Sequence, residues 1–317
     1  QGVSTFDYNE IHDTLAIIYM DSLGALADLL NLIPNLMYAN IYKIAVYDFN
    51  LDFVLPDLKK LKELEWFVRD QRLLKCFRKA KLTTMNISED SETIHCDSLV
   101  EFLSSQDTLM SLTVTNSWTP VSILAEMVKL NAPNPLRLTK LTIDVEGGSY
   151  SVFHPRFDHE NLLRFFKSQT ENLKHVEIGE GTRRSVYEPA FALTKLDTLI
   201  VSINELSQYE GSYARLEKNH SVRTIKLRDC SYYGVRTLRY FFQKFPNVHS
   251  LILTEITPDT NNNILSLAQC LRKLESLSLL TADGVSFDCM KFWNLKSLQI
   301  YMLTDKTDWN QFTKIHS

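Results

Sequence analysis

Glycine and proline are scarce in this sequence, with nine of each among its 317 residues. Loops that cradle phosphate groups need glycine wherever the backbone approaches the ligand closely. Segment 146–149, Glu-Gly-Gly-Ser, has two glycines but lacks the lysine that follows them in a phosphate loop. We therefore expect no phosphate-binding loop, no cofactor and no enzymatic activity.

Cysteine is also sparse, and the five residues are far apart with no Cys-x-x-Cys pair. This odd count and wide spacing indicate neither a disulfide framework nor a zinc knuckle. Because free cysteine packs like a small apolar residue, we expect buried, reduced thiols in a protein of the cytoplasm or nucleus. The five are Cys76, Cys96, Cys230, Cys270 and Cys289.

Long apolar runs and an excess of basic charge are missing as well. No run reaches the 18 apolar residues of a membrane span, and residues 1–10 have no basic region before an apolar one. We therefore expect neither a membrane segment nor a signal peptide. With 34 basic and 38 acidic residues the net charge is −4, so we expect no nucleic-acid or membrane partner.

One pattern does recur along the chain: an apolar residue, two of any kind, an apolar residue, one of any kind, and a third apolar residue. Its copies lie about 27 residues apart, within the 20–29 residues of a leucine-rich repeat. We call the three apolar residues of each copy its anchors. Nine clear copies begin at Leu82, Leu109, Leu138, Leu173, Leu196, Val222, Val248, Leu274 and Leu295. Two weaker copies precede them, Leu61/Leu64/Trp66 and either Leu36/Ala39/Ile41 or Ile41/Ile44/Val46.

The repeat predicts an α/β leucine-rich-repeat solenoid. The last two anchors are two residues apart and therefore share one side of a strand. Apolar stripes at helical spacing lie between the strands, such as Leu99, Phe102 and Leu103. We expect a curved horseshoe with parallel strands on the concave face and helices on the convex face. Residues 1–35 would be a cap or first repeat, 36–303 the array, and 304–317 a tail or cap.

The style of the repeats resembles that of F-box/leucine-rich-repeat proteins. Segments 99–114 and 241–253 carry the likeness, with a helical side, an Asn or Pro-Asn before the strand and no regular asparagine ladder. The likeness covers residues 20–303 as a repeat class, and no F-box is visible beside it. In that family the repeats recruit a protein substrate, and the F-box recruits the adaptor of a cullin ubiquitin ligase. The resemblance thus implies substrate recognition for such a ligase.

Residues that alternate with the anchors would face the concavity and form a polar sheet of mixed charge. Its charged middle is the best candidate for a protein partner, because charge sets orientation and association rate. Aromatic and arginine residues in the loops after the strands are further candidate anchors, although such residues also pack against neighbouring loops. The partner-binding candidates are Lys140, Asp144, His175, Glu177, Lys226 and Arg228 on strands, and Trp118, Tyr150, Arg183, Arg184, Tyr187, Tyr232 and Tyr233 in loops.

Two constellations resemble reactive sites but have the wrong spacing. His154 and His159 do not form a His-Glu-x-x-His pair and are separated by Pro155, so we expect no metal. No base is identifiable for Cys96, which precedes a helical stripe.

Three functions remain open from the sequence. The first is substrate recognition for a cullin ligase, and the second is a free-standing regulatory or scaffold repeat protein. The third is a secreted recognition domain, which glycans on the sequons at Asn86 and Asn219 would favour. Both sequons lie in or beside predicted strands, where a glycan fits poorly.

Overall fold

A computed structural model describes the greater part of the repeat array. The described residues are 6–7, 14–17, 23–42, 58–67, 74, 77–88, 96–115, 124, 127–128, 136–144, 159–179, 184–202, 217–228, 235–256, 268, 270–282 and 294–301. The chain forms two compact units, an N-terminal unit (Gln1–Asn172) and a C-terminal unit (Leu173–Ser317).

The strands of the N-terminal unit follow one another in the sheet in chain order. The first two form an antiparallel pair, and every later described strand of the unit pairs in parallel with its predecessor. The described strands are β1 (Phe6–Asp7), β2 (Thr14–Ile17), β3 (Tyr38–Tyr42), β4 (Glu63–Phe67), β5 (Thr84–Ser88), β6 (Ser111–Thr115) and β7 (Lys140–Asp144).

The C-terminal unit repeats this arrangement with parallel pairs alone. Its described strands are β8 (His175–Ile178), β9 (Thr198–Ser202), β10 (Thr224–Arg228), β11 (Ser250–Ile256), β12 (Ser276–Ala282) and β13 (Ser297–Tyr301). The register joins equivalent positions of successive copies, for example Leu251 with Leu277. Each copy of the sequence pattern therefore supplies one strand.

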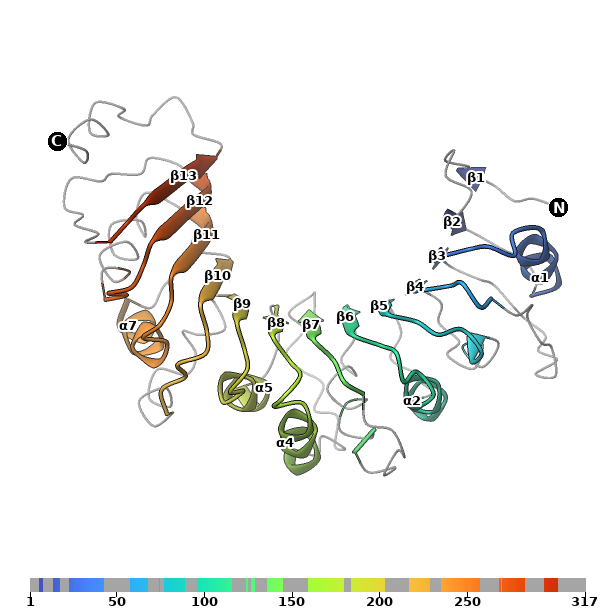
Figure 1. Ribbon diagram of the computed structural model, residues 1–317, viewed down its shortest axis with the longest axis horizontal. Coiled ribbons are helices and arrows are strands. Elements are labelled where there is room, and N and C mark those ends of the chain that lie inside the picture. The colour runs from blue at the N-terminus through green and yellow to red at the C-terminus, as the bar shows by residue number, and fades with distance from the viewer. Residues whose placement is uncertain are drawn as a thin grey trace, which may run out of the picture. The chain divides into compact units, whose positions relative to one another are not determined.

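Helices connect the strands and lie on one side of them within each unit (Figure 1). In the N-terminal unit they are α1 (Leu23–Leu32), α2 (Cys96–Ser104) and α4 (His159–Ser168), and in the C-terminal unit α5 (Arg184–Phe191) and α7 (Val235–Lys244). The predicted stripe of Leu99, Phe102 and Leu103 is buried in α2. Parallel strands joined through helices in a repeating register are the α/β leucine-rich-repeat solenoid that the sequence predicts.

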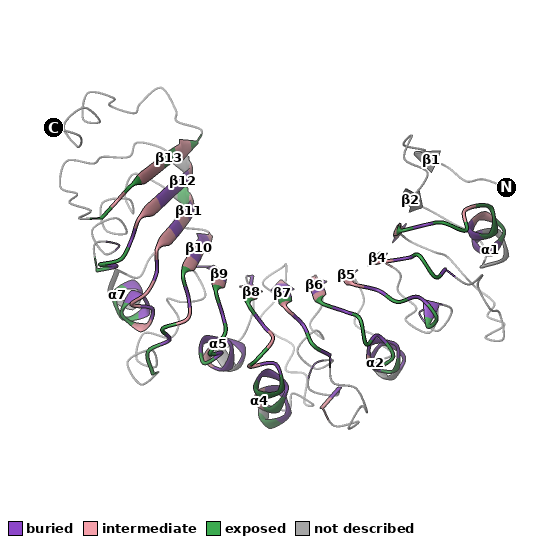
Figure 2. Ribbon diagram, viewed as in Figure 1, coloured by how far each residue is buried: buried purple, intermediate pink, exposed green. Residues whose placement is uncertain are grey.

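The anchors form the core. In β5, for example, Met85 and Ile87 are buried, whereas Thr84 and Asn86, which alternate with them, are half-buried; Figure 2 shows such alternation along the strands. Each fully buried leucine contributes about 1.5–3 kcal/mol relative to an exposed one. The first weak copy uses the register Leu36/Ala39/Ile41, whose side chains are all fully buried. The last copy differs, since Leu295, Leu298 and Ile300 are only half-buried.

Buried amide side chains tie the turn of one repeat to the turn of its neighbour. Gln169 is 1% exposed; its Oε1 accepts a hydrogen bond from Leu138 N (3.0 Å) and its Nε2 donates to Leu136 O (2.6 Å). In the same way Gln106 Oε1 accepts from Leu82 N (3.1 Å). Each satisfies backbone groups that burial would otherwise leave without a partner.

In the C-terminal unit, packed aromatic rings connect neighbouring repeats. Phe241 and Phe245 of α7 and its following turn pack on Phe191 of α5, with centroids 5.7 and 5.6 Å from that ring. Tyr187 extends this cluster from the next turn of α5, 5.8 Å from Phe191. Tyr187 is fully buried, so the prediction that it contacts a partner is wrong; it faces the core because its position lies on the apolar stripe of α5.

The proposed domain limits at residues 35 and 303 stay predictions. Strand β2 lies within the first segment and pairs in parallel with β3, and the tail 304–317 lies outside the described residues.

Candidate functional site

The sheet face opposite the helices carries a preorganised polar group in the N-terminal unit. The register places Asn40, Glu65 and Asn86 side by side on β3, β4 and β5. Asn40 Nδ2 donates to Glu65 Oε2 (2.7 Å), and Asn86 Nδ2 donates to Glu65 Oε1 (3.2 Å). Both carboxylate oxygens are therefore held by neighbouring strands, which fixes the side chain in place. We call these three residues the Glu65 ladder.

Tyr38 completes the surroundings of the ladder. It lies on β3 two residues before Asn40, and partial burial together with its hydrogen bond to Glu65 and the charge of that carboxylate raises the pKa of Tyr38 to about 12. A carboxylate held by two amides and a phenol is a rigid hydrogen-bond acceptor.

The C-terminal unit carries an ion pair on the corresponding face. Glu177 of β8 and Arg228 of β10 form a salt bridge that crosses over β9, and their side chains are 12% and 33% exposed. Ile200, the β9 residue in register with Glu177, is only 9% exposed. The ion pair thus covers an apolar side chain, and each charge neutralises the other. Lys226 of β10 is half-buried in the same region of the face.

The structure brings two of the strand candidates into contact. Glu177 and Arg228 are in contact. Lys140 is exposed at the start of β7, and Asp144 is half-buried at its end. His175 begins β8 opposite Thr198 of β9. Their role in binding stays a prediction.

Five of the seven loop candidates lie outside the described residues, namely Trp118, Tyr150, Arg183, Tyr232 and Tyr233. Arg184 is the first residue of α5, and its side chain is not described.

The sequence pattern predicts that the residues alternating with the anchors are exposed to solvent, but some of them are buried. Thr142, Ser202 and Ser278 are less than 9% exposed. Short side chains between longer ones are covered by them: Ser278 Oγ, for instance, donates to Oε1 of Gln299 on the next strand (3.2 Å). Fewer polar side chains are therefore exposed on this face of the sheet than the alternation in the sequence predicts.

The histidine and cysteine residues considered in the sequence do not form a metal-ligand group within the described residues. There, no group of three or more His, Cys, Asp or Glu side chains is placed to hold a metal. His159 begins α4, whereas His154 is not described. Cys270 is exposed, so the prediction of a buried thiol is wrong for this residue; it lies in the turn before Leu271 rather than on an anchor position.

Both sequon asparagines are engaged in hydrogen bonds. Asn86 belongs to the Glu65 ladder, and Asn219 is 8% exposed with its Nδ2 donating to Phe191 O (2.8 Å) and Leu193 O (2.9 Å). A glycan on either amide would replace these bonds. Within the part of the chain that the structure describes, no helix is long and apolar enough for a membrane span.

Sequence reasoning missed the Glu65 ladder and the buried amides. Asn40 and Glu65 lie in the two weak copies of the pattern, and Asn86 lies in the first clear copy, which begins at Leu82. Glu65 nevertheless occupies the position between the last two anchors, which carries candidates in other copies. The amides follow a helix in the shared pair Ser-Gln, at Ser105-Gln106 and Ser168-Gln169. That recurrence was the available signal.

Comparison with known proteins shows similarity to a solved structure at low sequence identity. No protein-family model matches the chain, and no curated protein matches it. A solved structure titled "Crystal structure of TLR13-ssRNA13 complex" is similar at 16% identity and a TM-score of 0.49, over 92% of this chain and 49% of that one. This chain spans about half the length of that structure. The assignment to the leucine-rich-repeat fold therefore depends on the strand register and the buried anchors.

Proposed function

We propose that this chain is a protein-interaction module that recognises a protein partner on the sheet face opposite the helices. The observation that carries the proposal is the Glu65 ladder, in which two strands hold a carboxylate on that face at fixed position. Groups fixed before binding lose little conformational entropy when a partner arrives. Nothing in the ladder or the Glu177–Arg228 ion pair combines a nucleophile with a base, so binding is the function these side chains support.

Site-specific photo-crosslinking tests which face binds. A photoreactive amino acid replaces Thr84, half-buried on β5 in register with Glu63, or Lys167, exposed in the last turn of α4. The proposal expects a covalent adduct with a protein partner from position 84 and none from position 167. Equal labelling from both positions, or labelling from 167 alone, would overturn it.

The resemblance of the repeats to F-box/leucine-rich-repeat proteins supports a finer proposal. The bound protein would be the substrate of an F-box-type cullin ubiquitin ligase, in the cytoplasm or nucleus, and the chain itself would catalyse nothing. Affinity capture of the full-length protein tests this link, with recovery of a cullin adaptor as the expected result. Capture of the partner without any adaptor would leave the module as a free-standing scaffold protein.

A secreted recognition domain is the remaining alternative. Intact mass with and without glycosidase decides it, because a secreted domain would lose glycan mass. We expect no change, since both sequon amides are hydrogen-bonded in the fold.

A further inference from the structure

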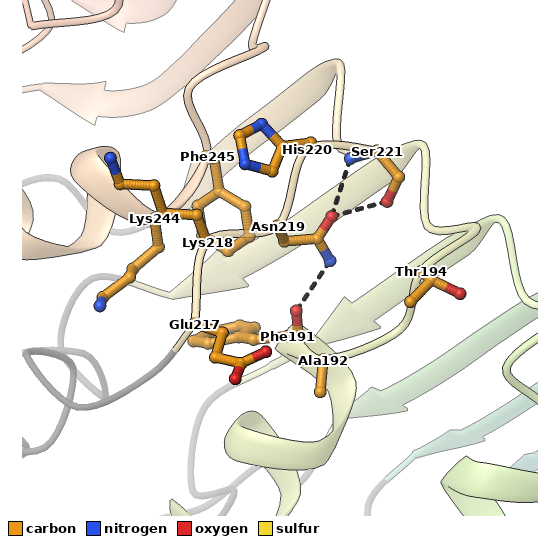
Figure 3. A pocket seen from close by; sticks show the side chains of 10 residues that line it. All are labelled: Phe191, Ala192, Thr194, Glu217, Lys218, Asn219, His220, Ser221, Lys244 and Phe245. Carbon is orange, nitrogen blue, oxygen red and sulfur yellow. Dashed lines mark hydrogen bonds between the residues drawn. The ribbon is translucent and has the colours of Figure 1, made fainter.

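A cavity of about 290 Å³ lies in the C-terminal unit, and neither Glu177 nor Arg228 of the ion pair lines it. It is formed where α5 and α7 end and where the turn before β10 begins (Figure 3). Phe191 and Phe245, 4% and 0% exposed, provide its apolar floor. The lining also includes Lys218, His220 and Lys244.

Hydrogen bonds hold the turn of this cavity in shape. Asn219 Nδ2 donates to two carbonyls at the end of α5, and its Oδ1 accepts from Ser221 N (2.9 Å). The backbone N of Asn219 donates to Lys244 O, the last residue of α7 (2.7 Å). The turn is thus fastened to both helix ends, and the cavity is formed before any ligand arrives.

Two lysines give one side of the cavity rim a positive charge. Lys218 is exposed and Lys244 is half-buried, and both side chains extend to the same side of the cavity in Figure 3. Partial burial and the positive charge of Lys218 lower the pKa of Lys244. An anion placed between two ammonium groups is attracted by both. Glu217, the acidic residue of the lining, lies beside Phe191 and apart from the two amines in Figure 3.

We propose that this pocket binds an acidic segment of a partner protein, with one apolar side chain on Phe191 and Phe245 and an adjacent carboxylate on Lys218 and Lys244. The cavity is at the lower limit of small-molecule pockets, which occupy roughly 300–1,000 Å³, and so suits one side chain. Exposed Thr194 and His220 at the rim leave room for the chain on either side. This site is separate from the sheet face and does not depend on the function proposed there.

The test uses the full chain and a fluorescent probe peptide containing Asp-Glu-Phe-Asp, with binding measured by fluorescence polarisation. Two control peptides replace either the phenylalanine by serine or the acidic residues by their amides. The proposal expects binding of the probe, weakening with salt, and at least tenfold weaker binding of each control peptide.

Variants locate the site. The double variant Lys218→Ala with Lys244→Ala is expected to weaken the probe at least tenfold, whereas Lys174→Ala, an exposed lysine of the same unit, leaves its affinity unchanged. Lys244→Gln keeps most of the side chain and its packing, so loss of binding there reports charge rather than misfolding. The proposal is overturned if wild type does not bind the probe, if the lysine variants bind it unchanged, or if inorganic phosphate displaces it at equal affinity.

Discussion

The two units build the same repeat with different contacts between neighbouring turns. In the N-terminal unit the described contacts include buried glutamine amides, Gln106 and Gln169, which bond to the backbone of the preceding turn. In the C-terminal unit a cluster of phenylalanines joins α5 to α7, beside one buried amide, Asn219, that bonds to Phe191 O and Leu193 O. The comparison shows that anchor spacing specifies the fold, while the connection between turns can be polar or apolar.

Outer asparagines add a second difference. Asn247 Nδ2 donates to His220 O, and Asn294 Nδ2 donates to Arg272 O, both at 2.7 Å and both in the C-terminal unit. Each precedes an anchor and reaches the equivalent turn one repeat earlier. These bonds are exposed to solvent, so water can replace them and their individual worth is small.

The largest expected effect is from Phe241→Ala. Phe241 is fully buried and contacts three rings, with Phe245 at 5.0 Å. Removing a buried phenylalanine costs about 3–5 kcal/mol of unfolding free energy. Phe77→Ala in the N-terminal unit is the matched change, and it should cost less because its ring contact is with Trp66 alone among the described pairs.

Denaturant unfolding with hydrogen exchange would measure both variants. We expect Phe241→Ala to increase exchange in α5 and α7, and Phe77→Ala to act near β4. Equal losses of unfolding free energy would mean that the aromatic cluster stabilises the C-terminal unit no more than a single edge contact stabilises the N-terminal unit. That result would contradict the difference between the two units.

The next effect concerns the buried amides. Gln169→Ala removes the partners of Leu138 N and Leu136 O, whereas Gln106→Ala removes the partner of Leu82 N. Each orphaned buried group costs roughly 1–3 kcal/mol, so Gln169→Ala should be the more destabilising. Hydrogen exchange at the Leu138 and Leu82 amides locates the damage, and unchanged protection at both amides would show that water takes the place of the side chain.

A smaller effect is expected from Arg228→Ala. It leaves the largely buried carboxylate of Glu177 without its cation, and the partial exposure of Arg228 reduces the cost to about 1–2 kcal/mol. The double variant Arg228→Ala with Glu177→Gln should recover most of this loss. Lys81→Ala breaks the exposed pair with Asp107 and should leave the denaturation midpoint unchanged within error. Equal losses of stability in Arg228→Ala and Lys81→Ala would contradict the expectation that the more buried ion pair contributes more.

The smallest effect is a titration in the N-terminal unit. Tyr38 has its pKa raised to about 12, from the ordinary value of 10. Because the folded state keeps this proton where the unfolded chain has lost it, the associated stability is complete below pH 10 and disappears as pH rises through 12. In ¹³C-tyrosine NMR we expect the Tyr38 resonance to titrate late, to be absent in Tyr38→Phe and to shift to lower pH in Glu65→Gln. A Tyr38 resonance that titrates at the ordinary tyrosine value of 10 would contradict the predicted shift.

The repeat array was predictable because each anchor triplet has to be buried, and burial fixes which side of a strand it occupies. This is why even the weak copy at Leu61, Leu64 and Trp66 forms a strand with buried anchors. The same argument predicts the polar columns. It cannot predict their exposure, as buried Ser202 shows, because coverage depends on the lengths of side chains on the adjacent strands.

The functional groups were only partly predictable. Glu177 and Arg228 were both candidates, but their salt bridge joins β8 to β10 across β9 and needs three-dimensional distances to be seen. The pocket at Phe191, Lys218 and Lys244 was not predictable, because its residues come from helix ends and a turn whose spacing varies between repeats. Anchor periodicity contains no information about such places.

The one-to-one register of the strands, such as Leu253 opposite Leu279, has a consequence for how this chain can change over evolutionary time. Loss or duplication of an entire coil preserves the match between neighbours, since each strand meets only the one beside it. Deleting a single amino acid inside a strand exchanges its two sides and turns leucines outward. Lineages of such proteins should therefore gain or lose whole coils, and smaller length differences should accumulate in the connecting segments.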